Sequence, residues 1–194
     1  MSKTGKIIDP TTYIITSDET LYAIFKLVED CTKVVHYDWF NFSLNSVYES
    51  NPGVDGHKEV INGYYCSPKV NLKGKITIPR KYNGQDVVRI GDFNGTEQKI
   101  THVFMESGTG KAPLAQVDSM AFNNVNTLRY FDFANTSLRI IEANAFQMCN
   151  LEADWIEMEK LDKLFFIGDY AFQGGIIFNT PTNLILPSSI EAIT

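Results

Sequence analysis

Hydrophobic and polar positions repeat along the second half of the chain with a period of about two dozen residues. Each full unit begins with a β-branched residue and has Ala-Phe four and five positions later; the full units are residues 117–122, 141–146 and 167–172. Partial units begin at Ile90 and Ile193, so the steps between first residues (90, 117, 141, 167 and 193) are 27, 24, 26 and 26. A unit this short cannot bury an apolar core alone and has to stack on its neighbours. The pattern therefore predicts a solenoid.

Short alternating segments precede these units and predict one strand per coil. In each segment two apolar positions flank a central residue, which faces the other way in an extended chain. The segments are residues 76–78, 103–105, 131–133, 156–158 and 184–186. Stacked in parallel, the strands form one wall of the core, and the Ile and Ala-Phe positions form the opposite wall. We expect a mainly β, right-handed solenoid of about four to five coils with low helical content.

The first 70 residues contain no repeat, and we predict a strand-rich cap there. Residues 11–28 and 34–48 alternate like strands, residues 51–56 read as a turn-rich loop, and residues 59–65 can pair back. A cap is needed because a bare terminal coil exposes apolar surface and unpaired strand edges. We divide the chain into an N-terminal β segment (1–34), a β cap (35–70) and the solenoid (71–194), which we expect to be incomplete at its C-terminus.

Two half-motifs that recur in order carry a family resemblance. The phrases Ile-Thr-Ile-Pro (76–79) and Leu-Ile-Leu-Pro-Ser-Ser-Ile (184–190) combine with Ile-Gly-Asp-Tyr-Ala-Phe (167–172). Over residues 70–194 this resembles the BspA-type (treponemal-type) leucine-rich repeat, although the first unit lacks Ala-Phe and the second has an insertion at 107–113. The resemblance implies a leucine-rich-repeat solenoid that acts as a non-enzymatic binding module on a microbial cell surface, with relatives in phages. Residues 18–25 are similar to the closing strand of the Listeria–Bacteroides surface repeat, which would make the N-terminal segment the end of a small β repeat.

Composition and charge exclude several partner classes. The formal net charge is −6, and the sequence has no cluster of Lys and Arg, so we expect no nucleic-acid partner. No apolar run is long enough for a transmembrane helix, and the first 20 residues do not resemble a signal peptide. The three cysteines are too few and too scattered for a disulfide framework or a zinc site, and we predict buried, inert thiols.

The motifs associated with catalysis are missing or incomplete. Residues 106–111 superficially resemble a phosphate-binding loop, but Met105 and Ala112 stand where that loop needs glycine and a hydroxyl residue. We interpret this segment as a flexible insertion between coils. The three histidines lie far apart, and the sequence has no nucleophile elbow or calcium ladder. We therefore predict no enzymatic activity, no catalytic residue, no cofactor and no metal site.

The outward positions of the predicted strands are the best candidates for binding. If Val103, Phe131 and Ile156 face the core, alternation turns their neighbours outward. The candidate residues on this face are His102, Phe104, Tyr130, Asp132, Trp155 and Glu157. Aromatic rings beside hydrogen-bonding groups are typical anchors of protein and glycan interfaces. The alternatives are that the N-terminal section or a neighbouring chain covers these rings, or that a register shift of one residue exchanges them with the core.

Two hypotheses for the function remain open. In the first, the chain is a recognition or adhesion module that binds protein or carbohydrate through the strand face. In the second, it is a structural component of an assembly, such as a phage tail or capsid-associated protein, and its partners are neighbouring subunits. The family resemblance favours the first hypothesis and a cell-surface or extracellular location. The lack of a recognisable signal peptide favours the second, with a location in the virion.

Overall fold

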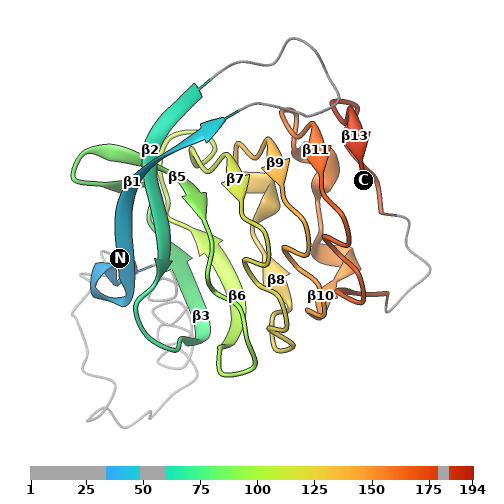
Figure 1. Ribbon diagram of the computed structural model, residues 1–194, viewed down its shortest axis with the longest axis horizontal. Helices are drawn as coiled ribbons and strands as arrows, with labels where there is room; N and C mark the ends of the chain where they lie inside the picture. The colour runs from blue at the N-terminus through green and yellow to red at the C-terminus, as the bar shows by residue number, and fades with distance from the viewer. Residues whose placement is uncertain (1–33, 49–59, 179–183) are drawn as a thin grey trace, which may run out of the picture.

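The computed structural model describes residues 34–48, 60–178 and 184–194. It is mainly β, with a β-solenoid of about five turns that follows an antiparallel hairpin (Figure 1). The predictions for residues 11–28, 18–25 and 51–56, and the prediction for Cys31, lie outside the described residues. All the helices in the described part of the chain are three-residue 3₁₀ turns, and none is long and apolar enough to cross a membrane.

The Ile positions form one continuous sheet along the solenoid. Its strands in spatial order are β1 (Phe40–Tyr48), β2 (Val60–Pro68), β5 (Gln85–Ile90), β7 (Gln116–Val117), β9 (Ile140–Ile141), β11 (Phe166–Ile167) and β13 (Ala192–Ile193). β1 pairs antiparallel with β2, and the remaining pairs on this path are parallel. The short strand β4 (Lys81–Tyr82) pairs antiparallel with β5 beside this path. The predicted hairpin of the cap is confirmed, and β2 adds it directly to the sheet.

The parallel register places one repeat residue of each coil in a single column. Cys66 pairs with Ile90, Ile90 with Val117, and the column continues through Ile141 and Ile167 to Ile193. Cys66 therefore takes the place of the β-branched residue in the rung that the hairpin supplies. Its thiol is buried, and burial raises its pKa far above the ordinary value. Cys149 is also buried, with its pKa raised by burial to about 12, so buried thiols are confirmed at both described positions.

The opposite wall is less regular than predicted. β3 (Lys73–Ile78), β6 (Lys99–Met105) and β8 (Tyr130–Phe131) form a parallel sheet, whereas β10 (Leu151–Glu152) and β12 (Ile176–Ile177) form a separate pair. The 3₁₀ turns on this wall are η2 (Phe133–Asn135), η3 (Ala153–Trp155) and η4 (Met158–Lys160), and η1 (Tyr37–Trp39) precedes β1. The strand predicted at 131–133 is confirmed only at Phe131, because η2 begins at Phe133. The strands predicted at 156–158 and 184–186 are wrong, because residues 156 and 157 lie between two 3₁₀ turns, Met158 begins the second of them, and residues 184–186 form no strand.

The spacing of buried residues explains the failure at 156–158. Ala153 and Ile156 are buried three residues apart. After a step of two residues, Met158, Leu161 and Leu164 are again three residues apart and buried. A 3₁₀ turn has three residues per turn, so residues at this interval share one face. The spacing of Ile156 and Met158 fits a strand as well, and two apolar positions alone cannot distinguish the two conformations.

Phenylalanine rings stack along the axis of the solenoid. Phe93 stacks on Phe122 with ring centroids 5.0 Å apart, Phe122 on Phe146 at 5.4 Å, and Phe146 on Phe172 at 5.3 Å. The predicted row of successive rungs is confirmed. Phe93 extends it into the first coil, although that coil lacks the Ala-Phe pair.

The Ala-Phe turns are joined by backbone hydrogen bonds that all run in one direction. The N–H groups of Met120, Phe122 and Asn124 donate to carbonyl groups of the following turn, at distances of 3.0, 2.7 and 2.9 Å. Asn144, Phe146 and Met148 repeat the pattern toward the next turn, at 2.8, 2.7 and 2.9 Å. In each turn the residue before Ala and the residue two after Phe have a positive φ. These residues are Met120, Asn124, Asn144, Met148, Tyr170 and Gly174.

Candidate functional site

The outward side of β3, β6 and β8, which we call the strand face, carries a cluster of rings. Lys75, His102 and Tyr130 pair in one row across the three strands, and Thr77 pairs with Phe104 in the next. Phe104 lies 6.0 Å from His102 and 5.3 Å from Tyr130 between ring centroids. The rings are half-buried, whereas the residues between them, such as Val103, are buried in the core. The predicted register is therefore correct over these strands.

Two residues of the strand face, His102 and Tyr130, have shifted pKa values. Burial lowers the pKa of His102, and the positive charge of Lys75 lowers it further, against the opposing effect of Glu152. Burial raises the pKa of Tyr130 well above its ordinary value, and the charge of Asp132 and a hydrogen bond to its carboxylate add to this. His102 is therefore neutral and Tyr130 protonated near neutral pH.

Asp132 is the most buried of the predicted site residues whose side chains the structure describes, with 5% of its surface exposed. Its Oδ1 accepts hydrogen bonds from Asn135 Nδ2 at 2.7 Å and from the Tyr130 hydroxyl at 3.2 Å. Its Oδ2 accepts one from the backbone N–H of Met105 at 3.4 Å. The carboxylate thus joins β6, β8 and η2.

The other two predicted site residues do not lie on strands. Trp155 is the last residue of η3, and its side chain lies outside the described part of the structure. Glu157 precedes η4 and forms an ion pair with Lys160. Glu157 still lies close enough to Tyr130 for its charge to raise the pKa of that hydroxyl group. The structure therefore brings together His102, Phe104 and Tyr130 on the strands and Asp132 directly after β8, with Glu157 near them.

A cavity of about 240 Å³ opens beside Phe104, where β6 ends. Its lining residues are Arg80, Phe104, Met105, Glu106, Ser107, Gly108, Gly110, Asp132 and Asn135. The lining combines one aromatic ring, a methionine, a guanidinium group, two carboxylates, an amide and exposed backbone of the insertion. Glu106 accepts a hydrogen bond from the backbone N–H of Arg80 at 2.8 Å. Such a lining suits a ligand rich in hydroxyl groups, or an ammonium group, because carboxylate and amide oxygens accept hydrogen bonds.

Arg80 holds the insertion in place at the edge of this cavity. Its guanidinium group donates to the carbonyl oxygens of Thr109 at 3.0 Å, Gly110 at 2.9 Å and Lys111 at 2.8 Å. The Lys111 ammonium group forms an ion pair with Asp162 at 2.6 Å, which ties the insertion to a later coil. The insertion that we interpreted as flexible is therefore fixed by side chains from both sides.

Sequence reasoning missed Arg80, Glu106 and Asn135 as parts of this site. Arg80 reaches acceptors 29 to 31 residues away, and no local pattern predicts a contact over that distance. The available signals were the insertion directly after a predicted strand and the position of Asn135 three residues after Asp132. Among the residues that the structure describes, no group of three or more His, Cys, Asp or Glu side chains could hold a metal ion.

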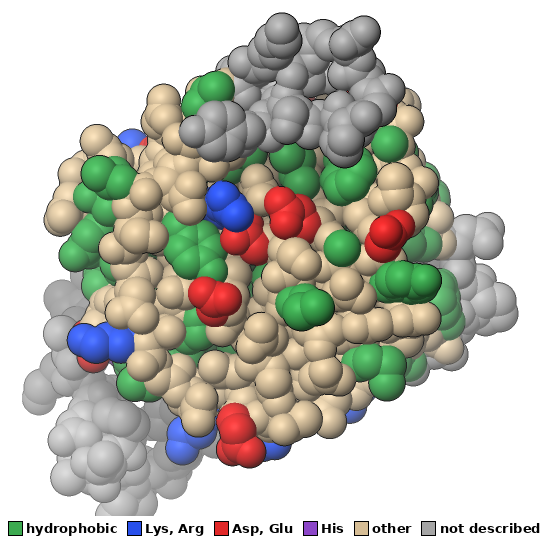
Figure 2. All heavy atoms as spheres, in the orientation of Figure 1, with side chains coloured by type: hydrophobic (Ala, Val, Ile, Leu, Met, Phe, Trp, Pro, Cys, Tyr) green, Lys and Arg blue, Asp and Glu red, His purple; other side chains and the backbone are tan. Residues whose placement is uncertain are grey.

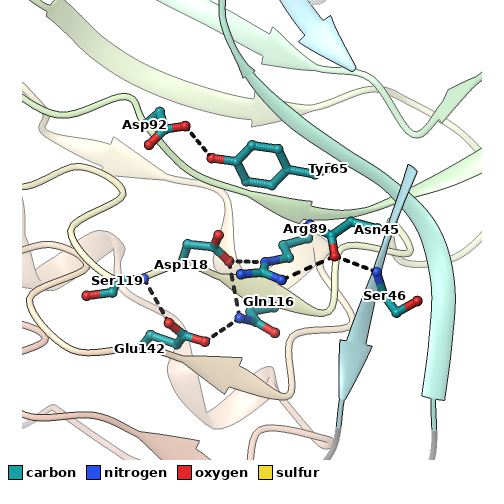
Figure 3. A network of polar contacts seen from close by, with 9 residues as sticks. All are labelled: Asn45, Ser46, Tyr65, Arg89, Asp92, Gln116, Asp118, Ser119 and Glu142. Carbon is teal, nitrogen blue, oxygen red and sulfur yellow. Dashed lines mark hydrogen bonds and ion pairs between the residues drawn. The ribbon is translucent and has the colours of Figure 1, made fainter. Parts of the chain in front are cut away.

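A second polar cluster lies on the outward side of the Ile sheet (Figure 3). Arg89 of β5 forms an ion pair with Asp118 at 2.5 Å, and its guanidinium group also lies over the Tyr65 ring. Gln116 of β7 donates to Asp118 at 3.2 Å and hydrogen-bonds to Glu142 of the next coil. Burial raises the pKa of Asp118 against the effect of Arg89, and Glu142 adds to the increase. This network joins the hairpin and three successive coils.

Searches with protein-family models, among curated proteins and among solved structures found no match for the chain. The functional interpretation therefore depends on the geometry of the strand face and its cavity.

Proposed function

We propose that this protein is a non-enzymatic recognition module that binds a glycan or protein ligand through the strand face. The coils are best explained as BspA-type leucine-rich repeats in a right-handed solenoid, and the recurring half-motifs support this. The observation that carries the function is the cavity of about 240 Å³ beside Phe104, with Asp132 and Glu106 in its wall.

The cavity favours a glycan over a protein ligand. Its volume lies below the roughly 300–1,000 Å³ of pockets for drug-sized ligands, so it suits a single sugar unit at the end of a chain. Sugar rings present hydroxyl donors to carboxylates and amides, and their C–H faces lie well on aromatic rings. Phe104, Asp132 and Asn135 offer these groups within one cavity. The half-buried rings of His102 and Tyr130 extend the surface beyond it.

A glycan array followed by calorimetric titration of the strongest ligand tests this function. We expect Phe104→Ala to weaken binding about tenfold or more, because an aromatic anchor commonly contributes over 1 kcal/mol. Asn135→Ala removes a group from the cavity wall and should also weaken binding. Ser188→Ala, an exposed position on the last coil, is the matched control and should bind like the unaltered protein.

Two outcomes contradict the proposal. Binding that Phe104→Ala and Asn135→Ala leave unchanged would remove the cavity from the binding site. Binding to a protein ligand but to no glycan would agree with recognition through this face and would contradict a glycan as the ligand.

A structural role in an assembly is the second candidate, and the apolar surface of the last coil favours it. Phe178, Ile185 and Ile193 are 55%, 60% and 57% exposed, and contact with a neighbouring subunit would bury them. Co-purification of the native protein with virions would support this role. Secretion and labelling at a cell surface would support the recognition module instead.

A further inference from the structure

Three large apolar side chains are exposed on the Ala-Phe turns of three successive coils. Met120, Met148 and Tyr170 are 50%, 53% and 62% exposed, and we call this set the turn ridge. It lies on the turns that join the two walls, away from the strand face. The ridge is therefore a surface separate from the one proposed above for recognition.

Each ridge residue occupies a backbone conformation that disfavours it. The φ angles of Met120, Met148 and Tyr170 are 57°, 57° and 56°, in the left-handed region. Each of these turns has a second residue with a positive φ. These residues are Asn124, Asn144 and Gly174, which tolerate the left-handed region well. An ordinary side chain there costs roughly 1–2 kcal/mol. About half of each ridge residue is buried within the chain, and a partner that covered the exposed half would add further burial.

The turns that carry the ridge are hydrogen-bonded to one another. The one-directional backbone hydrogen bonds join each turn to the next, and side-chain amides reinforce them. Asn123 donates to Gln147 at 2.6 Å, and Gln147 donates to Gln173 at 2.5 Å. The Met148 side chain lies over Gly174, where an added Cβ atom would come within 2.8 Å of the thioether sulfur. The turns are thus hydrogen-bonded to one another, and the methionine side chains above them adapt to the shape of what covers them.

Carboxylates accompany the ridge in every coil. Asp118 lies two residues before Met120 but is already paired with Arg89, whereas Asp169, which directly precedes Tyr170, is exposed and available to a partner. Glu142 occupies the coil between them. Figure 2 shows acidic side chains in a band across this side of the molecule, with a basic side chain among them and separate hydrophobic side chains nearby. An apolar partner surface that also carried positive charge would complement this face.

We propose that the turn ridge docks a basic, apolar segment of another protein. Lysine or arginine side chains of the segment would meet the carboxylates, and its apolar side chains would cover Met120, Met148 and Tyr170. Charge argues against a second copy of this chain, because each copy has a net charge of −6. Charge also argues against a nucleic acid, since phosphates would approach a band of carboxylates.

Selection from a random-peptide display library on the immobilised protein tests this proposal. The triple variant Met120→Asn, Met148→Asn, Tyr170→Asn removes the ridge with a residue that the neighbouring turns already hold at the same backbone conformation. Phe104→Ala, on the strand face, is the control that separates the two surfaces. Fluorescence polarisation then measures the affinity of each enriched peptide at low and high salt.

We expect enriched peptides that combine Lys or Arg with large apolar residues and that bind the triple variant at least about tenfold more weakly. Phe104→Ala should bind them unchanged, and added salt should weaken binding. Enriched peptides that bind the triple variant equally well, peptides without basic residues, or the lack of any enrichment would each overturn the proposal. A melting curve shows whether the triple variant is folded. If it is not folded, the single variant Met148→Asn is used in its place.

Discussion

Two rows of large apolar side chains run along the same turns with opposite surroundings. The inner row, Phe93, Phe122, Phe146 and Phe172, stacks ring on ring in the core. The turn ridge is half exposed or more. Phe146 and Met148 lie two residues apart in one turn, yet Phe146 is fully buried and Met148 is 53% exposed.

Hydrophobicity alone therefore does not assign a residue to the core of a solenoid. Residues two apart would share a face in a strand, but the turn, with a positive φ at Met148, sends one side chain inward and the other outward, and both can be apolar. The inner side chain is covered by the next coil, so its burial contributes to the free energy of folding. The outer one has no such cover within the described residues.

Phe146→Ala should destabilise the protein most. The ring is fully buried between Phe122 and Phe172, so its removal loses burial and leaves a cavity, at a cost of about 3–5 kcal/mol. Urea unfolding followed by circular dichroism measures the change. Phe146→Leu keeps most of the volume and should cost less. Equal stability of Phe146→Ala and the unaltered protein would show that the inner row does not hold the coils together.

Asp132→Ala tests a residue that faces outward from the sheet and is nevertheless buried. The change removes the acceptor of three hydrogen bonds and leaves the Met105 N–H group without this partner, which we expect to cost about 1–3 kcal/mol. Thermal unfolding by differential scanning calorimetry gives the value. The exposed Asp169→Ala is the control and should change stability by less than about 0.5 kcal/mol. A similar effect at both positions would contradict the structural role of Asp132.

Met148→Asn should stabilise the protein, although it replaces an apolar side chain with a polar one. Asparagine accepts the left-handed backbone of this position, and we expect a gain of about 0.5–1 kcal/mol. Chemical denaturation resolves a change of this size. Met148→Leu keeps the apolar character without relieving the backbone and should give no gain. A loss of stability in Met148→Asn would mean that Met148 contributes to packing after all.

The pH dependence contributed by His102 should be the smallest effect. Its pKa is lowered in the folded protein, so below the ordinary value near 6.5 the unfolded chain binds a proton that the folded protein does not. Stability should therefore fall as the pH decreases from 6.5 toward the lower folded pKa. Urea midpoints at several pH values, compared between the unaltered protein and His102→Asn, isolate this contribution. An identical pH slope in both proteins would show that His102 titrates normally.

The sequence predicted the regular half of the fold because its signal is repeated. The recurrence of Ile and Ala-Phe was enough to expect stacked coils and the row of Phe122, Phe146 and Phe172. Phe93 and Cys66 were missed as rungs because each replaces the usual residue of its coil. Only the backbone register reveals that they lie in the same columns.

The candidate site was predictable where strands alternate and unpredictable where they do not. His102, Phe104 and Tyr130 lie outward on β6 and β8, as alternation requires. Trp155 and Glu157 follow a 3₁₀ pattern that two apolar neighbours could not distinguish from a strand. The cavity could not be predicted, since Arg80 reaches across coils to main-chain oxygens that carry no residue-specific signal.

The one-directional hydrogen bonds between the Ala-Phe turns also have an electrical consequence. Each peptide unit has a dipole moment of about 3.5 D, and the donors at Met120, Phe122 and Asn124 all point toward the later coils. Asn144, Phe146 and Met148 add moments of the same sense, whereas dipoles in the flanking sheets largely cancel. The backbone on this side of the protein thus has a net dipole along the stacking axis, with its positive end toward the later coils.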